Sequence, residues 1–337
     1  MKTVTISLVV IMLSVFPAVS VSPVSAQQPI KLHFATFFGA THKISKLNEE
    51  FIKDLEKKTN GAVKVTYHPG STMVGPLQMY DSVVKGITDI GQSVLGYTPG
   101  RFPLSEIFDL PLGLKSAARA TKVQNLYMEK FRPKELDDTK ILWLFGNSSQ
   151  IFHTKKPIRT LEDLKGMKIR AAGQLARFVS LMGGVPVSVS AGEAYEAIER
   201  GAADGICIPY EALEGFRLAE VIRYSTENWG TAGGAILFTN INKKTFEAFP
   251  PDVKKVITDL SKEYAPKYGQ LWDEIDLAGK NYSLSKGNKV ISLTAAEEKK
   301  WVERARPIID DYVKRVKAKG LPADEVVKFI EDFKAQK

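Results

Sequence analysis

Arg170 is the side chain whose type and place in the sequence could bind a specific ligand. It closes the run Met167-Lys168-Ile169-Arg170, which reads as a short strand. Ligands of open α/β sheets lie beyond the carboxyl ends of strands, where a guanidinium can hold a carboxylate through two parallel hydrogen bonds. The alternative is an ion pair at the surface, and spacing alone leaves both interpretations open.

Aromatic and amide side chains follow the other expected strands or lie in nearby loops. Taken singly, each fits packing in the core or on the surface as well as contact with a ligand. Placed together beside Arg170, they predict an apolar, aromatic-lined pocket with few polar groups, as small-molecule sites require. These candidates are Phe37, Phe38, Tyr97, Asn147, Gln150, Tyr210 and, in a polar loop, Trp229.

Signatures of catalysis and cofactor binding are missing from the sequence. The run Gly91-Gln92-Ser93-Val94-Leu95 lacks the second glycine of a nucleophile elbow, no GxxxxGK[ST] loop occurs, and no GxGxxG turn follows the first expected strand. The single cysteine, Cys207, excludes an intramolecular disulfide and a multi-cysteine metal site. We therefore expect a binding protein without a cofactor rather than an enzyme, although two distant carboxylates could still meet in a cleft.

Length and composition are those of a globular protein. The 337 residues are 44% hydrophobic and 25% charged, which at roughly 150 residues per domain predicts two domains. The formal net charge is +9, but the basic residues are spread along the chain. We therefore expect no nucleic-acid partner.

Residues 1–26 have the pattern of a secretory signal peptide. A positive start precedes an apolar stretch from Val4 to Val21, and small residues precede Gln27. We expect cleavage after about Ala26 and export of the chain; a retained anchor is the alternative, and the break at Pro17 argues against it. No later stretch has enough consecutive apolar residues to span a bilayer.

Strand and helix patterns alternate over two stretches of the remaining chain. Their order predicts mostly parallel sheets with helices on both faces. Strands are expected at 30–36, 63–68, 89–95, 141–145, 167–171, 185–189 and 203–208, with helices between them. Capping boxes at Thr160–Asp163 and Ser190–Glu193 each predict the start of a helix.

The C-terminal third is predicted to be helical. A long helix begins at Pro250-Pro251 and continues through Ile275, with Pro266 inside it, and further helices are expected at 295–316 and 323–333. Because no Gly/Ser linker separates the two α/β stretches, we expect the chain to cross between them more than once and form a hinge. The expected division is 27–146 plus about 236–277 for lobe I, and 147–235 plus about 278–337 for lobe II.

Several motifs together resemble the periplasmic solute-binding proteins of tripartite ATP-independent (TRAP) transporters, and the resemblance covers essentially the whole mature chain. It is strongest over residues 159–170 (RTLEDLKGMKIR) and continues through 192–195 (GEAY), 203–205 (ADG) and Pro209. Gly70-Ser71 and Phe108-Asp109-Leu110-Pro111 fit as well.

The resemblance implies an α/β fold of the two-lobed periplasmic-binding-protein type, with a hinge and a long C-terminal helix packing across both lobes. It implies a periplasmic protein that closes around one small organic-acid ligand and delivers it to TRAP membrane permease subunits. Arg170 matches the family arginine that pairs with the ligand carboxylate, and Asn147 matches a nearby polar position. In closure, Phe37, Phe38 and Tyr97 would cover the body of the ligand from the other lobe.

Departures from the family pattern narrow the expected ligand. Gln150 stands where dicarboxylate and sialic-acid binders often carry arginine, Ile208 stands where binders of polar ligands tend to have asparagine, and Tyr97 stands where such members can have a cation. Ala191 leaves space where sialic-acid binders put a bulkier group. A second ligand carboxylate would lack a cation, so we expect a monocarboxylate with a hydrophobic or aromatic body.

Three alternatives remain at this stage. The ligand could be a smaller oxo- or hydroxy-acid, which the same guanidinium would also bind. The protein could be a periplasmic ligand sensor for a membrane receptor, since a sensor would share the cleft. An exported enzyme is the third alternative and would need a nucleophile, base or metal that the sequence does not display.

Overall fold

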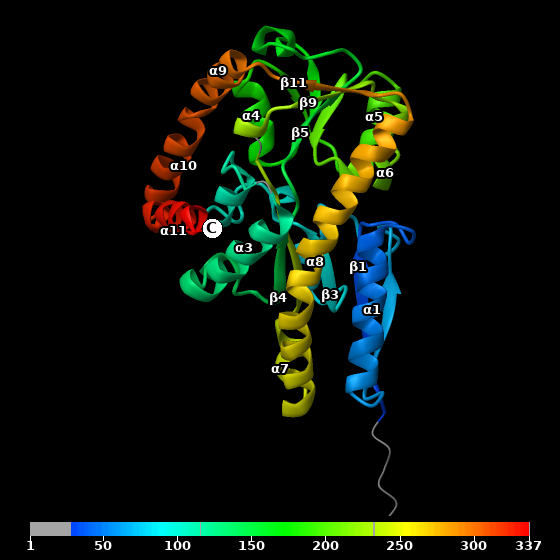
Figure 1. Ribbon diagram of the computed structural model, residues 1–337. Coiled ribbons are helices and arrows are strands. Elements are labelled where there is room, and N and C mark those ends of the chain that lie inside the picture. Colours follow the sequence, from blue (N-terminus) through cyan, green and yellow to red (C-terminus); the bar gives the residue numbers. More distant parts are fainter. Residues whose placement is uncertain (1–27, 115, 232, 337) are drawn as a thin grey trace, which may run out of the picture.

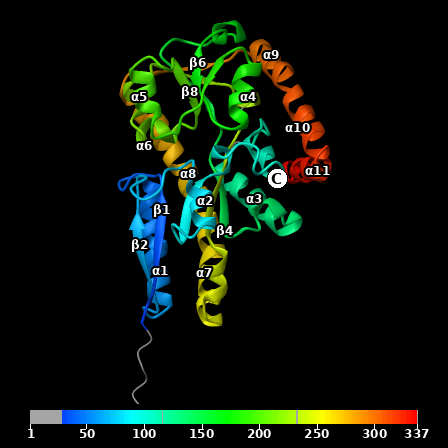
Figure 2. The same ribbon diagram turned by 180° about the vertical axis from the view of Figure 1, so that it is seen from behind.

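The computed structural model describes residues 28–114, 116–231 and 233–336. The expected signal peptide and its cleavage site lie outside the described residues. Two sheets, each flanked by helices, are joined by a long helix that runs beside both (Figures 1 and 2). This confirms the two-lobed α/β fold.

The first sheet has the strand order β2-β1-β3-β10-β4. β1, β2 and β3 are parallel, as the alternation of strands and helices predicts, whereas β10 lies antiparallel between β3 and β4. The strands are β1 (Ile30–Thr36), β2 (Val63–His68), β3 (Ile90–Val94), β4 (Thr139–Gly146) and β10 (Ile236–Asn242). The helices around them are α1 (Lys43–Lys58), α2 (Met79–Val84), α3 (Ala117–Phe131) and α7 (Lys243–Ala248).

The second sheet has the strand order β11-β9-β5-β8-β6-β7. β6 is parallel to β7 and β8, whereas β5 is antiparallel to both β8 and β9. The strands are β5 (Ile151–Thr154), β6 (Lys168–Arg170), β7 (Val185–Val187), β8 (Gly205–Ile208), β9 (Tyr224–Glu227) and β11 (Lys289–Ser292). The helices are α4 (Gln174–Leu181), α5 (Ala194–Glu199) and α6 (Glu211–Gly215).

Short 3-10 helices connect several of these elements, and two of them carry pocket residues. The first is η1 (Leu95–Tyr97) and the second is η2 (Ser105–Asp109). The others within the described ranges are η3 (Lys134–Leu136), η4 (Leu161–Leu164), η5 (Leu218–Glu220) and η6 (Trp229–Thr231).

The long helix is α8 (Pro251–Ser285), which packs across both halves of the molecule. It contacts α1, α3 and β4 on one side and α6 on the other. Proline at its first position needs no amide partner, and the helix continues through Pro266. Tyr268 stacks on Trp143 with ring centroids 5.2 Å apart, which anchors the helix on the first sheet. The expected long helix across the lobes is therefore present.

The last expected helices differ from the structure in one respect. The stretch 295–316 is two helices, α9 (Ala295–Ala305) and α10 (Pro307–Lys317), because Pro307 lacks the amide hydrogen that would continue the ladder. α9 contacts α4 of the second sheet, whereas α11 (Ala323–Ala335) contacts α3 of the first. The exact lobe boundaries stay a prediction.

The two expected capping boxes have different outcomes. At the start of η4, the Thr160 side chain accepts from the backbone and Asp163 accepts from the Thr160 amide, so the box is complete. At Ser190 the hydroxyl instead donates to the Glu193 carboxylate at 2.6 Å, and α5 begins only at Ala194. The second box is therefore only half formed, which corrects the prediction. Glu193 accepts from the Ser190 amide at 2.8 Å, but the Ser190 side chain does not cap the helix.

Candidate functional site

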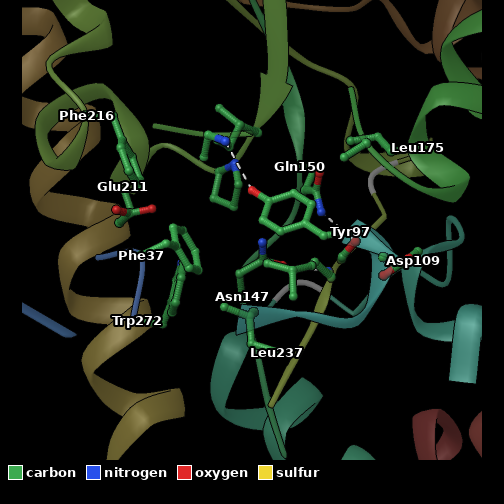
Figure 3. A pocket seen from close by; sticks show the side chains of 18 of the residues that line it. Phe37, Tyr97, Asp109, Asn147, Gln150, Leu175, Glu211, Phe216, Leu237 and Trp272 are labelled. Atoms are coloured by element: carbon green, nitrogen blue, oxygen red, sulfur yellow. Dashed lines mark hydrogen bonds between the residues drawn. The ribbon is translucent and has the colours of Figure 1, made fainter. Parts of the chain in front are cut away.

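A pocket with about 600 Å³ of empty space, its open side included, lies between the two sheets (Figure 3). Its walls come from both halves of the chain and from α8. Most of the residues expected at the site line it, namely Phe37, Phe38, Tyr97, Asn147, Gln150, Arg170, Ala191 and Ile208.

Arg170 ends β6 and is 3% exposed. Its Nε donates to the Val189 carbonyl at 2.8 Å and its Nη2 to the Tyr97 hydroxyl at 3.3 Å. No carboxylate of the described residues lies within 4 Å of its side-chain nitrogens, and it is the one basic residue among those that line the pocket. A buried guanidinium without a counter-charge attracts an anion strongly.

The Tyr97 side chain closes one side of the guanidinium. Its hydroxyl oxygen accepts from Arg170 Nη2 and from the Ala191 amide, the second at 3.1 Å. Tyr97 belongs to η1, beside the first sheet, whereas Arg170 belongs to the second. Since the oxygen accepts both bonds, its own hydrogen can be donated to a bound carboxylate.

Asn147 and Gln150 hold the segment that leads into β10. Asn147 Oδ1 accepts from the Ala235 amide at 2.7 Å, and Gln150 Nε2 donates to the Gly234 carbonyl at 2.6 Å. No hydrogen bond within the described ranges uses Asn147 Nδ2 or Gln150 Oε1. Each amide can therefore offer its second polar atom to a ligand.

Aromatic rings form one wall of the pocket, opposite Asp109 and Leu175 in Figure 3. Phe37 and Phe38 follow β1 with ring centroids 4.1 Å apart, and Phe37 stacks parallel to Phe216 at 6.5 Å. Trp272 of α8 packs edge-on against Phe38 at 5.9 Å. Such rings give a flat apolar ligand a large contact area.

His153 does not line the pocket but hydrogen-bonds to the end of a strand that does. It is fully buried in β5, where its Nε2 donates to the Ile208 carbonyl at 3.0 Å and its Nδ1 accepts from the Ser225 hydroxyl at 2.8 Å. Burial lowers the pKa of His153 to about 3, so the ring is neutral. It positions the end of β8, where Ile208 lines the pocket.

Tyr210 and Trp229, which the sequence also suggests for the site, are not among the residues that line the pocket. Tyr210 is the N-cap residue of α6, and its hydroxyl donates to Glu227 at 3.1 Å. Trp229 lies in η6, half-buried against the core.

Several lining residues were not singled out from the sequence. Asp109 belongs to the Phe108-Asp109-Leu110-Pro111 motif, so the family resemblance could have pointed to it as a pocket residue. Glu211 comes shortly after the expected strand 203–208, next to Tyr210, but the sequence gives no reason to select it. Leu175, Phe216, Leu237 and Trp272 come from helices, a loop and an antiparallel strand whose approach depends on the tertiary fold.

Glu211 forms a buried pair with His42 across the two halves. His42 caps α1 with its Nδ1 accepting from the Ile44 amide, so its Nε2 donates to Glu211 Oε1 at 2.6 Å. Both side chains are 4% exposed. Gly215 permits this approach, since a Cβ there would lie 2.5 Å from the Glu211 oxygen. The negative charge of Glu211 is therefore engaged before a ligand arrives.

The described part of the chain offers neither a metal site nor a membrane span. Within it, no group of three or more His, Cys, Asp or Glu side chains could hold a metal ion. None of its helices combines the length and the apolar composition that crossing a bilayer requires.

Two α/β halves, a helix across both and a pocket between them with one buried cation define a two-lobed solute-binding protein. The model of bacterial extracellular solute-binding protein family 7 matches residues 34–315, and the chain belongs to this family. The family consists of transport receptors rather than enzymes.

Three relatives illustrate the match. A TRAP solute-binding protein from Rhodoferax ferrireducens, in complex with copurified benzoate, is 26% identical and superimposes with a TM-score of 0.85 over 90% of this chain and 97% of that one. A marine-metagenome TRAP protein described as specific for aromatic acid ligands, in complex with metahydroxyphenylacetate, is 27% identical with a TM-score of 0.87 over 91% and 100%.

The third relative is the C4-dicarboxylate-binding periplasmic protein DctP of Rhodobacter capsulatus, 26% identical over 88% of this chain and 90% of its own. These relatives are thus receptors for organic acids of different classes, namely benzoate, metahydroxyphenylacetate and C4-dicarboxylates.

Proposed function

We propose that this protein is the periplasmic receptor of a TRAP transporter and captures a monocarboxylate with a hydrophobic or aromatic body. The observation that carries the proposal is Arg170, a buried guanidinium that lines the pocket and has no carboxylate partner among the described residues. Its Nη groups and the Tyr97 hydroxyl would together bind one carboxylate.

The pocket's charges favour one carboxylate over two. Arg170 is its single basic lining residue within the described ranges, while Glu211 and Asp109 are acids. A dicarboxylate would bring a second negative charge into a buried space without a cation, which costs several kcal/mol. The rings of Phe37 and Phe216 instead suit a flat apolar body.

Ligand capture would couple to closure of the lobes. A carboxylate held by Arg170 of one half and covered by Phe37 of the other contacts both, so binding favours the closed state. Closure fixes the relative positions of the two lobe surfaces, which the membrane permease would then recognise. The benzoate-bound and aromatic-acid-specific relatives support this ligand class.

A thermal-shift screen of the mature protein tests the ligand class. Benzoate, phenylacetate and mandelate are compared with succinate, glucuronate, pyruvate and lactate at equal concentrations. A ligand at 100 times its Kd adds about 2.7 kcal/mol to the free energy of unfolding, so a true ligand raises Tm by several degrees. We expect the aromatic acids to do so. Stabilisation by succinate alone would contradict the proposal, and stabilisation by pyruvate or lactate alone would favour a smaller oxo- or hydroxy-acid.

A further inference from the structure

Asp109 places a second polar group in the pocket, away from the aromatic wall. It is the last residue of η2, is 6% exposed, and lies with Leu175 on the side opposite Phe37 and Trp272 (Figure 3). Its Oδ1 accepts from the Ile236 amide at 3.4 Å, a long hydrogen bond. Within the described ranges its Oδ2 has no hydrogen-bond partner.

Two glycines approach this oxygen closely. A Cβ at Gly96 would lie 2.7 Å from Asp109 Oδ2, and one at Gly173 would lie 3.3 Å from it. Gly96 belongs to η1 and Gly173 precedes α4, so the oxygen lies where the two halves meet. Side chains at either position would fill the space beside the carboxyl group.

The surroundings of Asp109 favour a neutral ligand group rather than a cation. No Lys, Arg or His side chain of the described residues forms an ion pair with it. Burial, together with the nearby Glu106 charge, raises the pKa of Asp109 to about 8. At pH 7 the group is therefore mostly the carboxylic acid, which both donates and accepts a hydrogen bond.

We infer that Asp109 selects acids that carry a hydroxyl group on the body. A hydroxyl can donate to and accept from the same carboxylic acid, and it leaves the pocket's charge unchanged. This inference rests on the proposed function, because Arg170 and Tyr97 must first fix the carboxylate. The alternative is that Asp109 only anchors β10 through the Ile236 amide.

Calorimetry at pH 7 with matched ligands separates these roles. The probes are benzoate and phenylacetate, their 3- and 4-hydroxy forms, and the 3- and 4-methyl forms as controls of equal size. We expect at least one hydroxy acid to bind wild type about 10-fold more tightly than its parent acid, and its methyl form not to share this gain. This ligand comparison needs no variant to fold.

The variants Asp109→Leu and Asp109→Asn then assign the effect to the side chain. Leucine, of similar size, should reduce the hydroxyl advantage to about 2-fold or less and leave the parent acid's affinity within about 3-fold. Asparagine, which still donates and accepts, should retain most of the advantage.

Four results would overturn the inference. They are a hydroxyl advantage that persists in Asp109→Leu, equal weakening of parent and hydroxy acids in that variant, no hydroxy acid preferred by wild type, and a larger gain from 3-(aminomethyl)benzoate than from any hydroxy acid. Failure of wild type to bind any of these acids would instead refute the proposed function, and the inference with it.

Discussion

The Tyr97 hydroxyl lies 3.3 Å from Arg170 Nη2, and the same oxygen accepts the Ala191 amide at 3.1 Å. One side chain from the first half of the chain therefore contacts two groups of the second at the place where a carboxylate would bind. The contact links the orientation of the Arg170 guanidinium to the relative placement of the two lobes.

Tyr97→Phe should weaken binding of an aromatic acid about 10-fold, which corresponds to about 1.4 kcal/mol. The change removes the hydroxyl that orients Arg170 and leaves the buried Ala191 amide without its partner. Calorimetry with the tightest acid of the screen measures the change. Tyr282→Phe, at a half-buried tyrosine outside the pocket lining, is the control and should bind as wild type does. Equal affinity in both variants would contradict this role of Tyr97.

His42→Ala should lower the free energy of unfolding by about 2–3 kcal/mol, because it leaves the buried Glu211 carboxylate without its hydrogen bond. Urea denaturation measures the loss. His33→Ala changes an exposed histidine and should cost far less. Equal free energies of unfolding in the two variants would show that the His42–Glu211 contact does not stabilise the fold.

Gly173→Ala should disfavour closure and weaken ligand binding. Its Cβ would lie 3.0 Å from the Gly96 carbonyl oxygen, across the junction between the halves. Gly201→Ala is a matched control, since Gly201 also has positive φ (74°, against 57° at Gly173) but nothing lies within 4 Å of its Cβ. Ligand affinity and the radius of gyration with saturating ligand distinguish the variants. A loss of affinity as large in Gly201→Ala would attribute the effect to backbone strain alone.

The contribution of Asp109 to the stability of the folded protein should fall as pH rises from 6 to 8. Its folded pKa of about 8 exceeds the ordinary value of 3.8, so the folded state holds this proton more tightly than the unfolded chain does. That contribution is fully present below about pH 4 and is lost as pH rises through about 8. Asp276, with a folded pKa raised by burial to about 6, contributes mainly at lower pH.

Asp109→Asn should make the free energy of unfolding less dependent on pH between 6 and 8. One proton changes it by at most about 1.4 kcal/mol per pH unit. Urea denaturation of both proteins at pH 6, 7 and 8 measures the difference between their slopes. Identical slopes would show that Asp109 does not titrate in this range.

Much of the fold follows from local patterns in the sequence. The alternation from Ile30 to Val94 predicts β1, β2, β3 and their parallel order, and the structure confirms it. β10 was not expected, because its residues Ile236–Asn242 are buried on both faces and show no alternation. Its antiparallel insertion between β3 and β4 depends on contacts distant in sequence.

The pocket residues were predictable to different degrees. Arg170 ends β6 and Tyr97 comes shortly after β3, so the sequence could place each near a strand end, but the two strands belong to different sheets and only the tertiary fold brings the two side chains together. Trp272 projects from the middle of α8, and only the path of that helix across both halves brings it to the pocket. Asp109 belongs to a motif that the sequence shows, but its burial and the close approach of Gly96 and Gly173 to its carboxyl group are visible only in the folded structure.

Binding of the tightest acid from the screen to Arg170→Ala tests the central claim most directly. Arg200→Ala is the control, because Arg200 is an exposed arginine that pairs with Glu196 on its own helix turn. Loss of a charge-assisted contact in a buried pocket should weaken binding about 100-fold or more in Arg170→Ala and leave Arg200→Ala unchanged. An affinity of Arg170→Ala within about 3-fold of wild type would contradict the account.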